Sequence, residues 1–386
     1  MNNILMEEKF ECKEKIVIMH VAQAAGGVDR YLKMLLKNLD KTKFFNICIC
    51  SKDYKEDDYQ GLADEFISID MRRNVGIHDI LSIKNVRRYI KKYKPNIVYA
   101  HSSKAGLYAR VGNIGLKSTC IYNPHGWAFN MRCSNSKRML YRFVEKRLSI
   151  FCKKIICISE AEKNSAISNG ICDVNKLVVI NNGIELCYKK LFLSKESIGI
   201  PSDSYVIGMV GRISEQKAPD IFIRMAKLIK NKICNAYFIM VGSGDMEEEI
   251  IDYAKNNGLK DSLLITGWTD NPMQYVDLFD VAVLLSRWEG FGLVLPEYML
   301  ARKPIVATAV DAIPYIIRDK ENGMLVEQDS EVSAYNAVIE LYSNDELRAE
   351  IVEQAYKEVF ARFDAKRVSK EHEKLFDYLF DKIYYK

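Results

Sequence analysis

The chain has 386 residues, of which 48% are hydrophobic and 28% charged, values typical of a soluble globular protein of about two to three domains. Residues 1–15 mix Glu and Lys without an apolar signal core, and no run of about 18 apolar residues follows, so we expect a cytosolic protein without a transmembrane helix. The 10 cysteines form no C-x-x-C pair, which favours reduced core thiols over disulfides or metal ligands.

The charge is distributed unevenly. Residues 1–190 hold 33 Lys and Arg against 19 Asp and Glu, a net charge of +14, while the remainder carries −9. A basic half joined to an acidic half indicates that the first half meets an anionic partner. Phospholipid, a lipid pyrophosphate and nucleic acid all fit this description.

Apolar runs rich in Val and Ile alternate with segments of helical periodicity along the first half. In chain order we expect strand 16–21, helix 28–39, strands 45–50 and 66–69, helix 77–93, strand 97–100, helix 104–112, strand 119–122, helix 135–151, and strands 155–158 and 177–180. Continuous apolar strands separated by helices predict a parallel sheet that is covered on both faces.

The same pattern restarts after a polar stretch at about 188–203, which is the expected linker. We predict strand 205–210, helix 220–230, strand 236–241, helix 246–257, strands 263–266 and 281–285, helix 292–301, strands 305–309 and 324–326, and three closing helical segments, the last over 364–385. The sequence therefore predicts two doubly wound domains, 1–190 and 191–363, and a final helix, 364–386, that packs back on the first domain. Two such domains facing each other leave a cleft, the expected binding site.

Glycine-containing loops follow several of the predicted strands. Gly26 and Gly27 lie between the first strand and the first helix, and Gly242 follows the strand 236–241. Glycine at such places lets backbone N–H groups approach an anion, although a plain tight turn explains these residues equally well. Arg212 and Lys217 follow the strand 205–210. The guanidinium of Arg212 can donate two parallel hydrogen bonds and the ammonium of Lys217 is a compact charge, so the two suit a diphosphate; the alternative is a solvated loop with two surface cations.

A fourth loop combines two carboxylates with a glycine bend. Glu289 precedes the helix predicted at 292–301 and Glu297 lies inside it, eight residues later. One carboxylate could hold sugar hydroxyls and the other a ribose diol, and backbone amides at the helix start could bind phosphate or sugar oxygens. Two glutamates by themselves would equally fit a solvated face, so the interpretation rests on their spacing and their place after a strand.

This segment, Glu289–Glu297, resembles the E-x7-E motif of retaining glycosyltransferases, in particular family 4 of the GT-B fold. The resemblance extends over nearly the whole chain, through the loop Gly26-Gly27, the strand end Asn182-Gly183-Ile184, the phosphate loop Gly211-Arg212…Lys217 (with four residues in place of the family's five) and the late turn Asn322-Gly323. It implies an α/β protein of GT-B fold, with two doubly wound, Rossmann-like parallel-sheet domains facing across a cleft. The first domain would then be the acceptor side and the second the nucleotide-sugar donor domain.

The resemblance also implies roles for single residues. Arg212 and Lys217 would hold the donor diphosphate, and Glu297 the nucleotide ribose. Glu289 would hold the donor sugar together with the helix start, whose expected donor-binding residues are Phe291, Gly292, Leu293 and Val294. His125, in the loop Asn123-Pro124-His125-Gly126-Trp127, matches the family's H-G loop and would face the donor sugar; the alternative is a structural histidine. His101 and Lys104, in an H-S-S-K-A-G run similar to that of bacterial polysaccharide-assembly members, would lie nearer the acceptor.

Two departures from the family pattern stand after the second glutamate. Where members often have E-A-M-A-x-G, Glu297 is followed by Tyr298-Met299-Leu300-Ala301-Arg302-Lys303, and the G-G-x-x-E segment is replaced by residues 311–315, beginning with Asp311. These departures bear on recognition of the donor sugar and leave the diphosphate loop intact.

The sequence contains neither D-x-D nor H-E-x-x-H, so we expect no metal and no other cofactor. Arg212 and Lys217 would then stabilise the leaving diphosphate as its charge develops. No residue stands out as a covalent nucleophile. The family resemblance implies front-face attack, in which the departing phosphate oxygen assists deprotonation of the acceptor.

Two basic stretches in the first half bear on the acceptor. Residues 137–148 combine five basic residues with large apolar ones, which fits an interfacial helix on anionic lipid as well as a core-packed helix with a solvated face; residues 87–92 are also basic. Together they favour a lipid-pyrophosphate-linked acceptor at the inner face of the plasma membrane, in capsule or exopolysaccharide assembly, with UDP as the expected nucleotide.

Two other functions remain open from the sequence. A nucleotide-sugar 2-epimerase of GT-B fold would share the diphosphate site, and a nonenzymatic carbohydrate- or anion-binding protein would share the basic surface. No aromatic-interleaved RNA-binding signature occurs, so nucleic acid is not expected as a partner.

Overall fold

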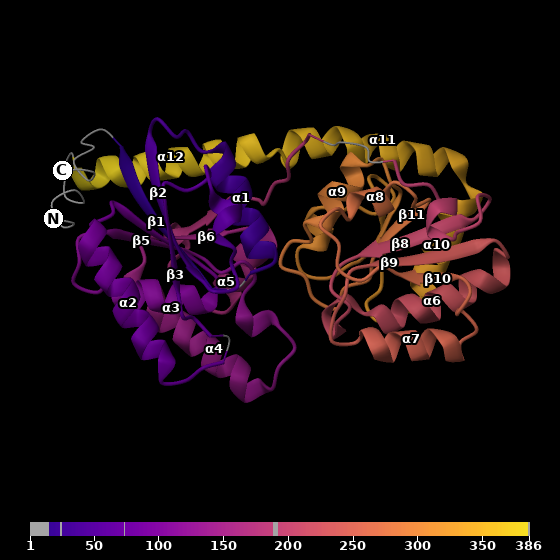
Figure 1. Ribbon diagram of the computed structural model, residues 1–386, viewed down its shortest axis with the longest axis horizontal. Helices are drawn as coiled ribbons and strands as arrows, with labels where there is room; N and C mark the ends of the chain where they lie inside the picture. Colours follow the sequence, from indigo (N-terminus) through magenta and orange to yellow (C-terminus); the bar gives the residue numbers. More distant parts are fainter. Residues whose placement is uncertain (1–14, 24, 73, 188–191, 385–386) are drawn as a thin grey trace. The chain divides into compact units, whose positions relative to one another are not determined.

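The computed structural model describes residues 15–23, 25–72, 74–187 and 192–384, in two compact units (Figure 1). Unit 1 comprises Met1–Gly183 with Ala365–Lys386, and unit 2 comprises Ile184–Asp364. The sequence prediction put the corresponding breaks after residues 190 and 363. The N-terminal segment 1–14, the start of the predicted linker at 188–191, and Tyr385 of the predicted last helix lie outside the described residues.

Unit 1 is built on a seven-stranded parallel sheet in the order β3-β2-β1-β4-β5-β6-β7. Its strands are β1 Ile16–Ala22, β2 Phe44–Ser51, β3 Glu65–Ile69, β4 Ile97–His101, β5 Thr119–Asn123, β6 Lys154–Cys157 and β7 Leu177–Val179. Its helices are α1 Gly27–Asn38, α2 His78–Tyr93, α3 Ser103–Gly112, α4 Asn135–Leu148, α5 Glu160–Ser168 and α12 Ala365–Tyr384. The strand order reverses between β1 and β4, which is where ligands of such sheets bind.

Both faces of this sheet are buried because neighbouring residues of a strand point to opposite sides. Met19 and Val98 belong to the cluster that packs under α2 and α3, while Ile18 and Tyr99 belong to the cluster under α1 and α12. The last helix, α12, lies beside α1 although the two are far apart in sequence (Figure 1). Phe376 of α12 meets Phe44 edge-on at 5.7 Å between ring centroids, so the C-terminal helix is part of the core of unit 1.

Unit 2 has a six-stranded parallel sheet in the order β10-β9-β8-β11-β12-β13. Its strands are β8 Tyr205–Val210, β9 Ala236–Val241, β10 Leu263–Ile265, β11 Val281–Leu284, β12 Ile305–Thr308 and β13 Met324–Val326. Its helices are α6 Pro219–Lys232, α7 Glu247–Asn256, α8 Met273–Val276, α9 Val294–Leu300, α10 Glu331–Ser343 and α11 Asp345–Arg362. Here the strand order reverses between β8 and β11.

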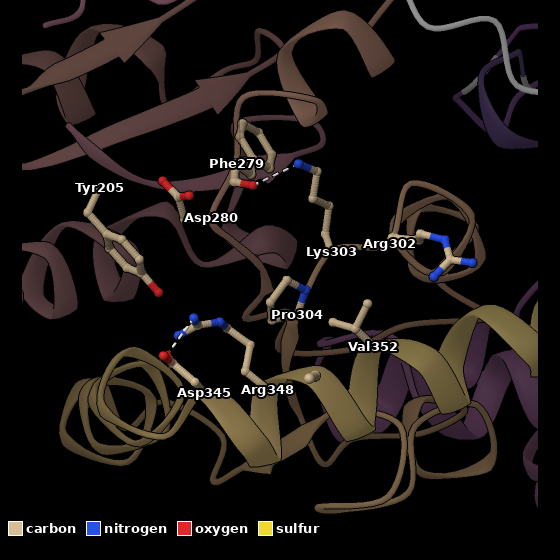
Figure 2. Close-up of a pocket in the computed structure, with 10 residues that line it drawn as sticks. Tyr205, Phe279, Asp280, Arg302, Lys303, Pro304, Asp345, Arg348 and Val352 are labelled. Carbon is tan, nitrogen blue, oxygen red and sulfur yellow. Dashed lines mark hydrogen bonds and ion pairs between the residues drawn. The ribbon is translucent and has the colours of Figure 1, made fainter. Parts of the chain in front are cut away.

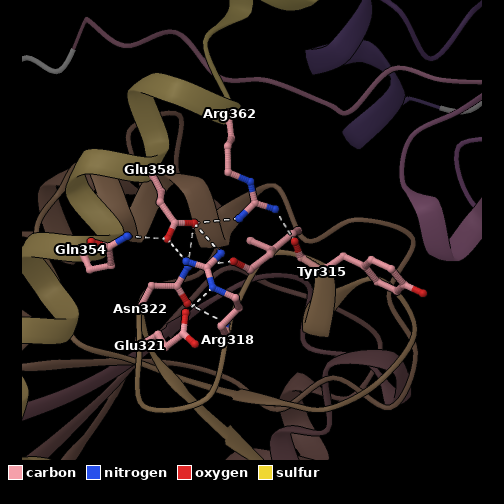
Figure 3. A network of polar contacts seen from close by, with 8 residues as sticks. Tyr315, Arg318, Glu321, Asn322, Gln354, Glu358 and Arg362 are labelled. Atoms are coloured by element: carbon pink, nitrogen blue, oxygen red, sulfur yellow. Dashed lines mark hydrogen bonds and ion pairs between the residues drawn. The ribbon is translucent and has the colours of Figure 1, made fainter.

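The turn Asn322-Gly323, one feature of the family resemblance, anchors helix α11. Figure 3 shows the carboxylate of Glu358 in α11 between the guanidinium of Arg318 and the amide of Asn322. Asn322 also accepts a hydrogen bond from the backbone N–H of Arg318 at 2.6 Å and donates to the carbonyl of Ile316 at 3.0 Å. This turn therefore fastens the end of unit 2 and does not need a ligand to explain it.

Three local differences separate the structure from the prediction. Helices α5 and α8 were not predicted, because α5 buries only Glu162 and Ala166 and so lacks an apolar stripe, and α8 has four residues. The predicted helix 135–151 ends at Leu148 and continues as a 3-10 turn.

Every cysteine in the described ranges is a free thiol, and no helix there is long and apolar enough to cross a membrane.

Candidate active site

The predicted donor loops of unit 2 leave the carboxyl ends of neighbouring strands. The loop 211–217 follows β8, Gly242 follows β9, residues 285–293 follow β11, and Asp311 comes shortly after β12. Because parallel strands end at one edge of a sheet, these loops gather around the point where the strand order reverses.

Close contact between backbones explains the glycines after β9. A Cβ on Gly242, whose φ is +135°, would lie 2.2 Å from the carbonyl oxygen of Gly211, and a Cβ on Gly244 would lie 2.1 Å from that of Ile213. The same loops are joined by a backbone hydrogen bond from Ile213 to Ser243 of 3.0 Å. Gly242, predicted to bind the donor, thus has a packing role that fixes the position of the loop 211–217.

The two predicted diphosphate ligands differ in their present contacts. Arg212 is exposed, and its guanidinium makes no hydrogen bond or ion pair with the described residues. Lys217 forms an ion pair through Nζ with Oε2 of Glu289, and Ser286 donates to the same oxygen at 3.2 Å. Two residues that sequence reasoning assigned to diphosphate and sugar are therefore brought together, and the exposed Arg212 lies on the same loop as Lys217.

Arg287, which the sequence analysis did not single out, ties these two loops together. Its side chain donates to Asp329 at 2.6 Å, to Asp220 at 2.7 Å and to the carbonyl of Glu215 at 2.9 Å. Its backbone N–H also donates to the carbonyl of Gln216 at 2.8 Å. These bonds hold the segment before Glu289 against the segment before Lys217.

A second contact that sequence analysis did not predict comes from Asp311, in the segment that departs from the family pattern. Asp311 has a positive φ of 45°, and its Oδ2 accepts a hydrogen bond from the backbone N–H of Glu289 at 2.9 Å. Burial raises the pKa of this carboxyl, while the amide of Glu289 opposes that shift. Asp311 therefore fixes the backbone of Glu289.

The helix start predicted to hold the sugar is largely packed into unit 2. Phe291 lies edge-on to Phe363 at 5.8 Å between ring centroids, and Val294 and Glu297 are buried as well. Gly292 has a φ of 83°, a left-handed conformation that favours glycine. Of the predicted contacts at Phe291, Gly292, Leu293 and Val294, the backbone amides are therefore the chemically suitable ones.

In unit 1, the loop that carries His125 is fixed by polar contacts of Asn123, His125, Gly126 and Trp127. The backbone N–H of His125, at a φ of 52°, donates to Oδ1 of Asn123 at 2.9 Å. The next backbone N–H, of Gly126, donates to Glu162 at 2.6 Å, and the indole of Trp127 donates to the carbonyl of Glu162 at 2.9 Å. Burial raises the pKa of Glu162 to about 7, an effect that the amides of Ile158 and Gly126 oppose. Glu162, on the helix α5 that was not predicted, thus shapes the H-G loop.

The two predicted acceptor-side residues are already engaged within unit 1. His101 is fully buried and bonds to His20 and His125, and its place nearer the acceptor stays a prediction. Lys104 pairs with Asp79 at 2.9 Å and donates to two backbone carbonyls, so its cation is satisfied without an acceptor. Gly26, with a φ of 95°, and Gly27 have open space where a Cβ would stand, at the start of α1.

A cavity of about 390 Å³ in unit 2 lies at the other edge of the sheet (Figure 2). It opens beside Tyr205, Asp280 and Pro304, which stand at the amino ends of β8, β11 and β12. Its Arg348 donates to Asp345 at 2.6 Å. Since ligands of parallel sheets bind at the carboxyl ends, this cavity is separate from the donor loops.

Comparison with known families identifies the chain. The family model described as Glycosyltransferase Family 4 matches residues 25–187, and the model described as Glycosyl transferases group 1 matches residues 192–358. The chain is a glycosyltransferase with a Family 4 domain followed by a group 1 domain. The family resemblance read from the sequence is thereby confirmed.

Individual relatives agree with this membership. The glycosyltransferase is 28% identical over 342 residues, 85% of its length and 87% of the other's, to the UDP-Gal:alpha-D-GlcNAc-diphosphoundecaprenol alpha-1,3-galactosyltransferase of Escherichia coli. It is 26% identical over 325 residues, 80% of its length and 84% of the other's, to the capsular polysaccharide biosynthesis glycosyltransferase CapM of Staphylococcus aureus. The crystal structure of HepE from Anabaena in complex with UDP and glucose superposes with a TM-score of 0.79 at 18% identity, covering 93% of this chain and 99% of that one. The predicted GT-B fold is confirmed.

Proposed function

We propose that this glycosyltransferase moves a sugar from a UDP-sugar to a saccharide carried on a lipid diphosphate, with retention of anomeric configuration, in the assembly of a bacterial surface polysaccharide. The observation that carries the proposal is the ion pair of Lys217 with Glu289, on loops at the carboxyl edge of the unit 2 sheet where the exposed Arg212 also lies. The E. coli relative, whose name gives UDP-Gal as donor and GlcNAc-diphosphoundecaprenol as acceptor, supports the choice of both substrates.

The donor diphosphate is proposed to displace an internal partner. Lys217 now neutralises Glu289, and an arriving diphosphate competes for the same ammonium group. Once Lys217 has turned to the phosphates, the Glu289 carboxylate is free to accept hydrogen bonds from hydroxyls of the sugar. Arg212 adds a second cation, so that the leaving diphosphate is stabilised as its negative charge develops.

The remaining donor contacts follow from the family resemblance. Glu297, buried on α9, is proposed to accept from the ribose hydroxyls, and the amides from Phe291 to Val294 to meet the sugar or phosphate oxygens. His125 of unit 1 is proposed to contact the donor sugar, and Gly26 and Gly27 to leave the start of α1 open to the donor. Two side-chain cations take the place that a metal holds in enzymes with a D-x-D motif, so activity in a chelator is expected.

The acceptor lipid requires a surface that tolerates a membrane, and α4 offers one. Its exposed apolar side chains Met139, Leu140 and Phe143 are 64%, 57% and 56% accessible, and they are interspersed with Lys and Arg. Glu145, in contrast, is buried, because its carboxylate pairs with Arg110 of α3 at 2.9 Å. Helix α4 is thus anchored by Glu145 and by Leu148, which is also buried, while Met139, Leu140 and Phe143 face outward. This exposed apolar surface supports peripheral contact with anionic lipid at the inner face of the plasma membrane.

A second apolar surface lies at the start of α2. Val75 and Ile77 are 87% and 84% accessible, and Ile80 and Leu81 are also exposed. Sequence analysis did not single out this segment, since its apolar residues are no more numerous than those of a core helix. The helices α2, α3 and α4 pack side by side on one side of the unit 1 sheet, so both apolar surfaces belong to the same layer.

The proposal is tested with purified protein and a panel of UDP-, GDP- and dTDP-sugars in EDTA, with and without a lipid extract. Saturable binding of a UDP-sugar and release of UDP that rises with lipid are the expected results. Isomerisation of the sugar nucleotide without release of UDP would replace the transferase by a 2-epimerase. Binding of saccharide without turnover of any nucleotide sugar would leave a carbohydrate-binding protein.

Sedimentation with anionic vesicles tests the apolar surface of α4 separately. Phe143→Ser should sediment with the vesicles less than the wild type.

A further inference from the structure

Three histidines and one asparagine form a continuous line of hydrogen bonds across the sheet of unit 1. Nε2 of His20 lies 3.2 Å from Oδ1 of Asn46, Nδ1 of His20 lies 3.2 Å from Nε2 of His101, and Nδ1 of His101 lies 3.1 Å from Nε2 of His125. The line follows the strand order β2-β1-β4-β5, because Asn46 is in β2, His20 in β1, His101 ends β4 and His125 follows β5.

The line has a direction that its first member determines. Oδ1 of Asn46 faces Nε2 of His20, while Nδ2 of Asn46 is buried without a partner among the described residues. With the oxygen in this place Nε2 of His20 carries the hydrogen, because an amide oxygen only accepts. A neutral imidazole has one N–H, so Nδ1 of His20 is an acceptor and Nε2 of His101 donates to it. By the same reasoning, Nδ1 of His101 accepts from Nε2–H of His125. The Nδ1 atom of His125 is then left with a lone pair.

The imidazoles must be neutral for this reasoning to hold. Burial lowers the pKa of His20 to about 4 and that of His125 to about 3, and it holds the pKa of His101 well below its ordinary value. In the described part of the chain, moreover, no group of His, Cys, Asp or Glu is arranged to hold a metal ion, so the ring nitrogens serve hydrogen bonds.

We propose that Asn46 is a positioning residue that sets the direction of this line, so that Nδ1 of His125 presents a hydrogen-bond acceptor to a ligand hydroxyl. Nδ1 has no partner among the described residues, and the ring is held edge-on to Tyr31 at 4.6 Å between centroids. The ligand hydroxyl is one of the donor sugar, a detail that rests on the proposed function. Because the position and direction of His125 are both set in advance, the site favours a hydroxyl over a carbonyl at that point.

His372, which is buried on α12, provides an internal reference with the opposite hydrogen position. Nδ1 of His372 lies 2.8 Å from the carbonyl oxygen of Val368, so Nδ1 carries the hydrogen. Its Nε2 lies 2.7 Å from the hydroxyl of Tyr31 and therefore accepts. The structure thus assigns the Nε2–H form to the three histidines of the line and the Nδ1–H form to His372.

Nitrogen-15 chemical shifts of the imidazoles, in the full chain labelled at histidine, distinguish the two forms directly. Single histidine substitutions assign the signals. The expected spectrum has Nε2–H at His20, His101 and His125 and Nδ1–H at His372. An Nδ1–H form of His125 in the wild-type protein would overturn the proposal without recourse to any variant.

Asn46→Leu removes the accepting oxygen and is expected to give mixed forms at the three histidines of the line, with His372 unchanged. Asn113→Leu is the matched control: Asn113 is also buried in unit 1, but its side chain donates to the carbonyl of Ser118 at 2.7 Å and touches no histidine. Circular dichroism checks that Asn46→Leu is folded. If the imidazole nitrogen-15 shifts of the folded variant were the same as those of the wild type, the role of Asn46 would be contradicted.

Binding separates this inference from the proposed function. In Asn46→Leu the Nδ1 atom of His125 no longer reliably accepts a hydrogen bond from the sugar, so this variant should bind UDP-galactose about fivefold more weakly than the wild type. UDP lacks the sugar and should bind the wild type and the variant equally. Equal weakening of UDP and UDP-galactose would indicate general damage and contradict a positioning role. If the wild-type protein bound no nucleotide sugar at all, the proposed function would fail, whereas the assigned forms of the histidines would still be decided by their shifts.

Discussion

Acidification should destabilise unit 1 through histidines that are buried in the neutral form. His20 and His372 are both fully inaccessible, and burial lowers the pKa of each to about 4. In the unfolded chain the same groups titrate near their ordinary value of 6.5. The unfolded state therefore binds more protons between pH 6.5 and 4, and stability that is present above pH 6.5 is lost as the pH falls through this window.

The size of the effect follows from these values. Between pH 7.5 and 5, each of the two histidines lowers the free energy of unfolding by about 2 kcal/mol. Glu162 acts in the opposite sense, because burial raises its pKa from 4.5 to about 7 and its protonation on acidification favours the folded state. Protonation of Glu162 raises the free energy of unfolding by about 2 kcal/mol between pH 7.5 and 5. His20, His372 and Glu162 together therefore lower the free energy of unfolding by about 2 kcal/mol. The lowered pKa values of His101 and His125 add to the loss.

Urea denaturation at pH 7.5 and 5.0 measures this loss, with Trp127 as the reporter of unit 1. The chain has three tryptophans, so Trp268→Phe and Trp288→Phe leave Trp127 alone. In that background His372→Gln keeps a polar side chain beside Tyr31 but cannot titrate. The variant should lose about 2 kcal/mol less than its parent on acidification. Equal losses in parent and variant would refute the reasoning.

Further predictions concern a buried ion pair and the donor loops. Glu145→Ala leaves the buried cation of Arg110 without its carboxylate and should cost about 3–5 kcal/mol of unfolding free energy by urea denaturation; a loss below about 1 kcal/mol would contradict this. Arg287→Ala should weaken UDP binding about tenfold in calorimetry, about 1.4 kcal/mol, because the loops before Lys217 and Glu289 separate. Gly242→Ala places a methyl group against the carbonyl of Gly211. It should lower the stability measured by thermal unfolding by about 1–3 kcal/mol and also weaken UDP binding. A variant with wild-type stability and UDP affinity would show that the loops of Gly211 and Gly242 do not need this close contact.

Much of the fold could be predicted because its strands are continuous apolar runs. A strand such as Ile97–His101 is buried along its whole length, so sequence composition alone marks it. The pair of Glu289 with Glu297 was also visible, since its spacing and its place after a strand lie within one short segment. Helix α5 could not be found in this way, because few of its residues are buried.

The contacts that shape the site were hidden for a different reason. Arg287 meets Asp220 and Asp329, which lie 67 and 42 residues away, so no local pattern signals the contact. The line from Asn46 to His125 likewise depends on the order of four strands. In Asp311 the sequence did show a departure from the family pattern, but only the structure reveals its bond to the backbone of Glu289.

Sugar transfer to a lipid-linked acceptor tests the central claim most directly. Purified protein is incubated in EDTA with labelled UDP-galactose and GlcNAc on undecaprenyl diphosphate, and other UDP-sugars follow if galactose is not moved. We predict a labelled lipid-linked disaccharide with equimolar UDP, formed by the wild-type protein and lost in Glu289→Gln and Arg212→Ala, both of which remain folded. Absence of transfer from every UDP-sugar, or full activity in either variant, would contradict the account.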